Sequence, residues 1–215
     1  AQAMRLSTYK KSRIVSCCDE TDHYLCLPRG CEADVKTLLA DAGVPADVLD
    51  NTQNGKSIHV DFKGALREDQ NLAVAELLKH DTGVLSATTA FGKTVIAAKI
   101  IAERKVNTLI LVHRQQLLDQ WNDRLKTFLN ISETLPALEK KRGRKKAQSI
   151  IGWIGGGKSN PSGIVDIAIM QSLNRSGDVR ALVKDYGMVI VDECHHVPAF
   201  SFEEILKAVS AKYVY

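Results

Sequence analysis

The sequence lacks the long apolar segments that would mark a membrane or secreted protein. No apolar run among its 215 residues approaches the ~20 residues that a transmembrane helix needs. The first ten residues, Ala1–Lys10, have no apolar core of the kind found in secretory signals. We therefore expect an intracellular, cytoplasmic protein without a membrane partner.

The five cysteines also lack a recognisable framework. Their odd number fits a reducing compartment. Cys17, Cys18, Cys26 and Cys31 lie close together with His23, so a structural zinc site has to be weighed. Adjacent Cys17 and Cys18, and four residues between Cys26 and Cys31, are not usual zinc-ligand spacings. Buried or half-buried thiols are the favoured interpretation, with zinc as the alternative.

A generally basic surface is missing as well. The net charge is +4, but Lys140–Lys146 alone contains six basic residues, which leaves −2 for the rest of the chain. This run is compatible with an extended nucleic-acid track or with a solvated loop. Apolar residues make up 45% and charged residues 25%, an average globular composition that argues against wholesale disorder.

Residues 1–62 predict a small α+β module without a catalytic constellation. Two β-prone runs around a turn predict a hairpin, a helical apolar spacing predicts one helix, and an alternating run predicts a strand. In chain order these segments are Arg13–Cys17, the turn Asp19–Asp22, His23–Leu27, Glu32–Ala42 and Ser57–Phe62.

Residues 63–215 alternate between apolar strands and helices, which predicts an α/β domain with a mainly parallel sheet covered on both faces. The predicted strands are Gly83–Ser86, Asn107–Val112, Ser149–Ile154, Ile164–Met170, Met188–Val191 and Tyr213–Tyr215. The predicted helices are Leu66–His80, Thr94–Lys105, Arg114–Leu129, Asp178–Asp185 and Ser201–Ala211.

Ala87–Thr94 lies between a predicted strand and a helix, which is the setting of a phosphate-binding loop. Gly92 permits close backbone approach, Lys93 offers an ammonium to the β- and γ-phosphates, and Thr94 offers a hydroxyl to Mg²⁺. Ala87 stands where the GxxxxGK[ST] pattern has its first glycine, and alanine does not adopt positive φ cheaply. The alternative is a surface loop that caps a helix.

Asp192 and Glu193 follow the apolar strand Met188–Val191, at the edge where parallel sheets bind ligands. Asp192 is suited to hold Mg²⁺, and Glu193 to orient and deprotonate an attacking water. The alternative is an acidic loop that caps a helix. Because both motifs come directly after apolar strands, we predict a nucleotide site and expect Lys93 and Asp192 on neighbouring strand tips.

These motifs resemble those of superfamily 2 helicases and translocases of the DExH group. The motif residues are most similar to those of repair and restriction-type translocases. Motif II also differs from the Asp-Glu-Ala-Asp of DEAD-box RNA helicases. Both features favour DNA over RNA as the substrate. The resemblance covers residues 64–215 and implies a RecA-like P-loop domain. It is carried by Leu66–Gln70 (adenine element), Thr88–Thr94 (motif I), Leu111–Trp121 (motif Ia), Gly155–Gly157, Ile169–Leu173 and Asp192–His195 (motif II).

The resemblance implies ATP and Mg²⁺ as cofactors. Glu193 would be the catalytic base and Lys93 would act on the phosphates, while Thr94 and Asp192 would hold Mg²⁺. His195 would couple the nucleotide to the nucleic-acid track, or else belong to a polar loop. The implied nucleotide-binding residues are Arg67, Gln70, Thr89, Ala90, Phe91, Gly92, Lys93 and Thr94, with Gln70 on the adenine or, alternatively, an exposed helix residue.

The resemblance also implies that Arg114, Gln120, Gly156 and Gln171 face a nucleic-acid strand. Contacts of this kind read phosphate, so we expect salt-sensitive and sequence-tolerant binding. Each residue taken singly also suits a solvated helix face. Trp121 is interpreted as a core anchor, with a base-stacking platform as the alternative.

Superfamily 2 motors use two RecA-like domains, and the second supplies an arginine to the transferring phosphoryl group. No segment here resembles that domain, and Tyr213–Tyr215 ends within a predicted strand. We therefore expect the N-terminal fragment of a longer helicase or translocase, weakly active or inactive by itself, whose partner is the second RecA-like domain of the same parent. The alternatives are a P-loop phosphotransferase and a nucleic-acid-binding module with a degenerate nucleotide site.

Overall fold

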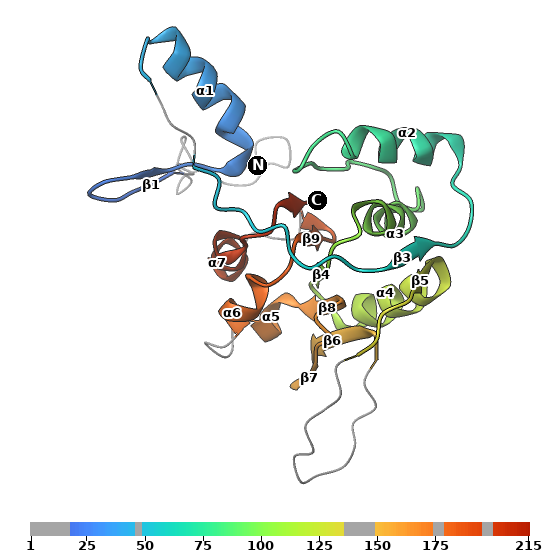
Figure 1. Ribbon diagram of the computed structural model, residues 1–215. Coiled ribbons are helices and arrows are strands. Elements are labelled where there is room, and N and C mark those ends of the chain that lie inside the picture. The colour runs from blue at the N-terminus through green and yellow to red at the C-terminus, as the bar shows by residue number, and fades with distance from the viewer. Residues whose placement is uncertain (1–17, 46–48, 136–148, 174–178, 195–199) are drawn as a thin grey trace, which may run out of the picture. The chain divides into compact units, whose positions relative to one another are not determined.

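The computed structural model describes residues 18–45, 49–135, 149–173, 179–194 and 200–215 (Figure 1). The chain divides into two compact units, Ala1–Asp50 and Asn51–Tyr215. The second unit begins earlier than the boundary at residue 62 that the sequence predicts. The reason is that β3 (Val60–Phe62) pairs antiparallel with β5 (Leu129–Ile131), so that this segment packs with the larger unit.

The small unit contains a hairpin and a helix. The helix is confirmed at the predicted place. The hairpin is displaced from its prediction, because Asp19 pairs with Cys26 and the turn closes between Thr21 and Tyr24. The predicted strand Arg13–Cys17 lies outside the described residues. The elements are β1 (Asp19–Glu20), β2 (Leu25–Cys26), the 3-10 helix η1 (Arg29–Cys31) and α1 (Glu32–Asp41).

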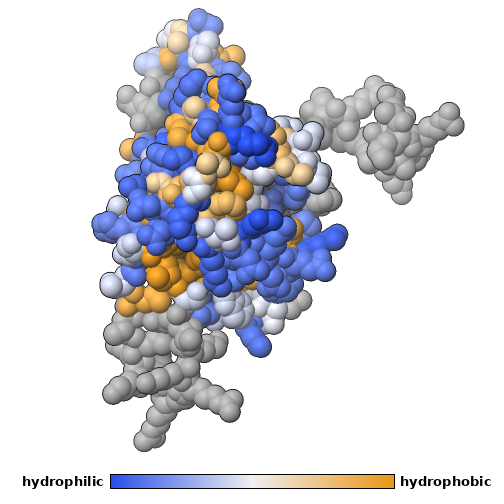
Figure 2. Space-filling view, turned by 90° about the vertical axis from the view of Figure 1, so that its right-hand side faces the viewer, coloured by the Kyte–Doolittle hydropathy of each residue, from blue (hydrophilic) through white to orange (hydrophobic). Residues whose placement is uncertain are grey.

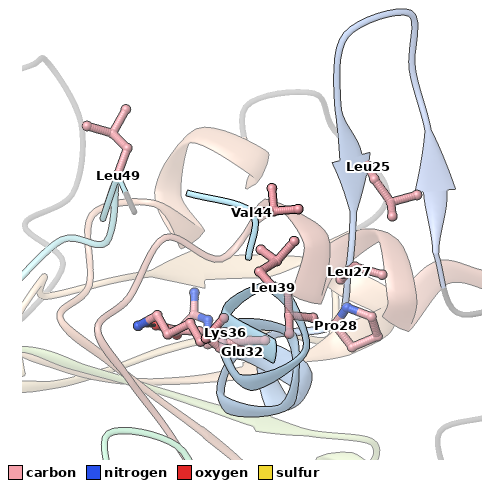
Figure 3. A pocket seen from close by; sticks show the side chains of 11 residues that line it. Leu25, Leu27, Pro28, Glu32, Lys36, Leu39, Val44 and Leu49 are labelled. Carbon is pink, nitrogen blue, oxygen red and sulfur yellow. Dashed lines mark hydrogen bonds and ion pairs between the residues drawn. The ribbon is translucent and has the colours of Figure 1, made fainter. Parts of the chain in front are cut away.

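Apolar side chains of the small unit border an open groove of about 720 Å³ beside α1 (Figure 3). None of the residues described in this unit is buried, and Leu49 remains 82% exposed. Cys18 and Cys26 are exposed as well, so the expectation of buried or half-buried thiols is wrong for these two residues. Within the described ranges, no group of three His, Cys, Asp or Glu side chains is arranged to hold a metal ion, and Cys17 lies outside them.

Six strands of the larger unit form one sheet in the order β10-β9-β4-β8-β6-β7. Every neighbouring pair is parallel except β6 and β7, which confirms the mainly parallel α/β architecture. The strands are β4 (Thr108–Val112), β6 (Ile151–Gly155), β7 (Lys158–Asn160), β8 (Val165–Ile169), β9 (Met188–Val191) and β10 (Tyr213–Val214).

Helices cover both faces of this sheet, as Figure 1 shows. On one face lie α3 (Lys93–Arg104) and α4 (Gln115–Phe128), with α2 (Glu68–Leu77) packed on α3. On the other face lie α5 (Met170–Leu173), α6 (Val179–Val183) and α7 (Phe200–Ala208). No helix in the described part of the chain is both long enough and apolar enough to span a membrane.

The central strand β4 explains why the core has two layers. Ile110 and Val112 belong to the cluster beneath α3 and α4, whereas Leu109 and Leu111 belong to the cluster on the opposite face. All four side chains are fully buried, and each contributes roughly 1.5–3 kcal/mol of transfer free energy. On the outer surface, hydrophobic side chains lie between hydrophilic ones over the face seen in Figure 2.

The predicted strand Gly83–Ser86 does not form. Thr82 makes an isolated bridge with Val214, the Gly83 N–H donates to the Val214 carbonyl at 3.0 Å, and Val84 is 79% exposed. The apolar residues of Gly83–Ser86 led to a wrong prediction because β10, the neighbouring strand, is only two residues long and offers no partner for the rest of the segment. The short elements β5, β7 and α5 are not predicted by the sequence.

Buried Asn107 joins four backbone groups at the amino ends of the strands. Its Oδ1 accepts from the N–H groups of Lys56 at 2.8 Å and Gly187 at 3.1 Å. Its Nδ2 donates to the carbonyls of Asp185 at 2.9 Å and Gly163 at 3.4 Å. With 1% exposure, the amide is itself buried, and each of its two polar atoms has two backbone partners.

We expect Asn107→Ala to lower the free energy of unfolding by about 3 kcal/mol, because four hydrogen bonds to backbone groups are lost at once. Asn71→Ala is the control, since exposed Asn71 makes one long hydrogen bond of 3.4 Å to the Leu66 carbonyl. That change should cost no more than about 0.5 kcal/mol. Urea denaturation measures both, and equal midpoints for the two variants would contradict the assignment.

Candidate nucleotide and nucleic-acid site

Four of the predicted site segments follow the carboxyl ends of four neighbouring parallel strands. The phosphate loop does not, because Gly83–Ser86 forms no strand, so the expectation that Lys93 lies on a strand tip is wrong. Because the four strands run in the same direction, their ends meet at one edge of the sheet. In spatial order, Asp192 follows β9, Arg114 follows β4, Gln171 follows β8 and Gly156 follows β6. The sheet therefore places segments that are far apart in sequence along a single edge.

Lys93 and Glu193 are in direct contact at this edge. Lys93 is the first residue of α3, and its Nζ lies 3.3 Å from Oε1 of Glu193. The side chains are 34% and 28% exposed. A partly solvated ion pair of this kind adds about 1 kcal/mol at most. What matters is its geometry, because it brings the phosphate-loop motif and the acidic motif together.

Both loops of this pair contain a non-glycine residue with positive φ. Ala90 has φ of 67° and Glu193 has φ of 53°. Such a conformation costs on the order of 1–3 kcal/mol and persists only when the surroundings impose it. Ala87 is not among the positive-φ residues of the described chain, so the alanine in place of the first glycine carries no such cost.

Gln70 is hydrogen-bonded to the backbone of the phosphate loop. Its Nε2 donates to the Phe91 carbonyl at 2.8 Å, and its Oε1 accepts from the Arg67 N–H at 3.0 Å. The Arg67 guanidinium donates to the same carbonyl at 2.8 Å. Gln70 is 4% exposed, so its interpretation as an exposed helix residue is wrong. A hydrogen bond from Arg67 also lowers the pKa of Asp69.

Asp192 is fixed through both its backbone and its side chain. Its N–H donates to the Leu111 carbonyl at 3.0 Å, and its Oδ2 accepts from Nε1 of Trp121 at 2.7 Å. Trp121 is 3% exposed, which confirms it as a core anchor. The hydrogen bond to Asp192 was not expected from the sequence. The available signal was that a buried tryptophan N–H usually finds an acceptor.

The residues at this edge fit a nucleoside triphosphate with Mg²⁺. Carboxylate and hydroxyl oxygens such as those of Asp192 and Thr94 are the ligands that Mg²⁺ prefers. The first N–H groups of α3 and the Lys93 ammonium suit phosphate oxygens. At the N-cap of α3, Gly92 has φ of 96°, and a Cβ there would lie 2.4 Å from Nε2 of Gln70.

The predicted nucleic-acid residues are all exposed, and three of them, Arg114, Gly156 and Gln171, lie at this edge. Arg114 is the N-cap of α4, and a Cβ on Gly156 would lie 3.5 Å from Oε1 of the adjoining Gln115. The first turn of α4 and the turn after β6 are thus neighbours. Gln120 lies farther along α4, and Gln171 lies on α5. His195 and the basic run Lys140–Lys146 lie outside the described residues.

Residues 63–214 match the family model described as "Type III restriction enzyme, res subunit". The chain belongs to this family. Its larger unit is a RecA-like domain of the kind that comes first in superfamily 2 helicases and translocases.

Curated relatives match about seven-tenths of the chain. One is a DNA 3'-5' translocase XPB2 of Sulfurisphaera tokodaii, 29% identical over 69% of this chain and 29% of the relative. Another is a putative helicase 109L of Invertebrate iridescent virus 3, 30% identical over 71% of this chain and 44% of the relative. The chain thus spans less than half the length of these two relatives.

A solved structure shows the same fold. The UvsW helicase from bacteriophage T4 aligns with a TM-score of 0.62 and 19% identity, over 90% of this chain and 71% of that one. At this level of identity the match concerns the fold alone. It agrees with the mainly parallel sheet described above.

We expect Gly92→Ala to destabilise the chain more than Gly157→Ala. Both glycines have positive φ, so alanine should cost about 1 kcal/mol at either position. Gly157 has open space around it, whereas a Cβ on Gly92 would displace the Gln70 amide from the Phe91 carbonyl. This displacement adds at least about 1 kcal/mol. Urea denaturation tests the difference, and an equal loss for both variants would show that Gln70 does not brace the loop.

Proposed function

We propose that the chain is the ATP-binding, N-terminal part of an ATP-dependent DNA helicase or translocase. The observation that carries the proposal is the 3.3 Å contact between Lys93 and Glu193, which unites the phosphate loop with the acidic strand end. Family membership supports the same reading. It also speaks against a small-molecule phosphotransferase.

Four residues of the nucleotide site have separate proposed roles. Lys93, with the N–H groups that open α3, binds the β- and γ-phosphates, and Thr94 and Asp192 hold Mg²⁺. The metal, when bound, neutralises charge on the phosphates. Once Lys93 turns to the phosphates, Glu193 accepts a proton from the attacking water. Glu193 is thus the proposed catalytic base.

Gln70 is proposed to read adenine with the hydrogen-bonding capacity that remains on its amide. One Nε2 hydrogen is used on the Phe91 carbonyl and one Oε1 lone pair on the Arg67 N–H, which leaves one donor and one acceptor. Adenine recognition needs one of each. The same side chain would then join the base to the phosphate loop, with Arg67 beside it.

The arginine that completes phosphoryl transfer is proposed to come from a second RecA-like domain of the parent protein. Such an arginine accelerates hydrolysis by about 10³–10⁵-fold. The chain alone should therefore bind ATP but turn it over slowly. The expected cytoplasmic, reducing location stays a prediction.

The nucleic-acid strand is proposed to follow the sheet edge from Arg114 toward Gly156. The printed name of the Sulfurisphaera relative, a DNA translocase, supports DNA as the substrate. Residues 1–50 contain eight carboxylates and six basic side chains, a net charge of −2, which leaves +6 for residues 51–215. We therefore assign strand contacts to the larger unit.

We expect Lys93→Ala to weaken ATP·Mg²⁺ binding about 10-fold or more, since a charge-assisted contact to phosphate is worth roughly 1.5–3 kcal/mol. Lys99→Ala is the matched control, because Lys99 lies in the same helix and pairs with Glu103. Isothermal titration calorimetry measures both. Absence of ATP·Mg²⁺ binding by the unsubstituted chain at millimolar concentration would instead support a degenerate nucleotide site.

We expect Arg114→Ala to weaken binding of single-stranded DNA at low salt and to reduce the slope of log K against log[salt] by about 0.7, the value for one phosphate contact. Arg124→Ala is the control, because Arg124 is also exposed on α4 but lies about 15 Å along the helix from Arg114. Fluorescence anisotropy across a salt series measures both slopes. Equal slopes for the two variants would place the strand elsewhere.

A further inference from the structure

The hydrogen bond between Trp121 and Asp192 has no part in the roles assigned above. Indole Nε1 donates to Oδ2 of the carboxylate over 2.7 Å. We propose that Trp121 is a positioning residue that holds Asp192 in the orientation required to ligate Mg²⁺. This inference rests on the proposed nucleotide site.

Trp121 is a rigid donor because its ring is part of the core. It is 3% exposed and lies in the apolar cluster with Leu118 and Leu125 of the same helix. The ring cannot rotate without opening that cluster. Leu111, at the end of β4, meanwhile accepts the Asp192 N–H at 3.0 Å. The β4–α4 segment therefore holds Asp192 at two points, one on the main chain and one on the side chain.

The Trp121 indole is a neutral donor, so Asp192 differs from the adjacent Glu193 in the charge of its partner. Glu193 pairs with the Lys93 ammonium, a flexible cation that compensates its charge. An indole N–H instead orients a carboxylate without compensating its charge. Asp192 thus keeps its full negative charge for a divalent cation. Because Oδ2 accepts the indole hydrogen bond, Asp192 would hold the metal chiefly through Oδ1.

The experiment measures Mg²⁺ dependence of nucleotide binding in Trp121→Phe, with Trp153→Phe as the matched control at the other tryptophan. The probe is N-methylanthraniloyl-ATP, titrated in EDTA and then at rising Mg²⁺. Loss of a partner that orients a metal ligand costs about 10–100-fold in metal affinity. We expect Trp121→Phe to raise the half-saturating Mg²⁺ concentration by about 10-fold or more at unchanged affinity in EDTA, and Trp153→Phe to change neither.

A second variant separates the hydrogen bond from the packing of the ring. Replacing Trp121 with 3-benzothienylalanine keeps the bicyclic shape and substitutes sulfur for the N–H. It should reproduce the Mg²⁺ shift while leaving the urea midpoint nearly unchanged. In Trp153→Phe, where Trp121 is the remaining tryptophan, adding Mg²⁺ to the ATP complex should also change the indole emission.

The outcomes distinguish this inference from the proposed function. An unchanged Mg²⁺ midpoint in both Trp121 variants, with Mg²⁺-dependent binding intact, overturns the positioning role alone. Equal weakening in EDTA and in Mg²⁺ also overturns it, because Trp121 would then support only the fold. If the unsubstituted chain shows no Mg²⁺-dependent binding of the probe, the nucleotide site itself fails, and the positioning role fails with it.

Discussion

The parallel pairing of β9 with β4 is the constraint on which the site depends. Leu111 lies opposite Val191, so the chain leaves both strands at the same edge of the sheet. Asp192 and Glu193 emerge from β9 there, beside the strand that leads into α4. The pairing is strongly specified because β4 is buried on both faces and its neighbours have almost no polar side chains to expose.

Each of the two adjacent carboxylates receives a different partner from this arrangement. Glu193 meets a charged and movable side chain, and Asp192 meets a neutral and immobile one. Positive φ at Glu193 and Ala90 shows that the loops are held in costly conformations by the packing beneath them. The loop backbones and Asp192 are thus held in place without a ligand, which would favour electrostatic stabilisation of the phosphoryl transfer proposed above.

At the opposite edge of the sheet, the polar side chains have a structural role. Fully buried Asp166 accepts from the N–H groups of Ser162 and Gly163, each at 2.7 Å, and from the Tyr186 hydroxyl. Burial, together with the Asp166 charge, raises the pKa of Tyr186. Asn107 lies at the same edge with four backbone partners. The Asp166, Tyr186 and Asn107 side chains there are buried and paired, whereas Lys93 and Glu193 remain partly open to solvent.

Local sequence patterns sufficed for the parallel α/β fold and for the two motifs, because strand burial and helix periodicity are written in consecutive residues. Other features depended on partners distant in the chain. Gly83–Ser86 remained irregular for want of a strand beside it, and β3 joined the larger unit through β5. The burial of Gln70 against the Phe91 carbonyl and the Trp121–Asp192 hydrogen bond likewise depend on residues distant in the chain. Long-range packing settles such contacts, since a residue's own neighbours do not encode which side chain it will meet.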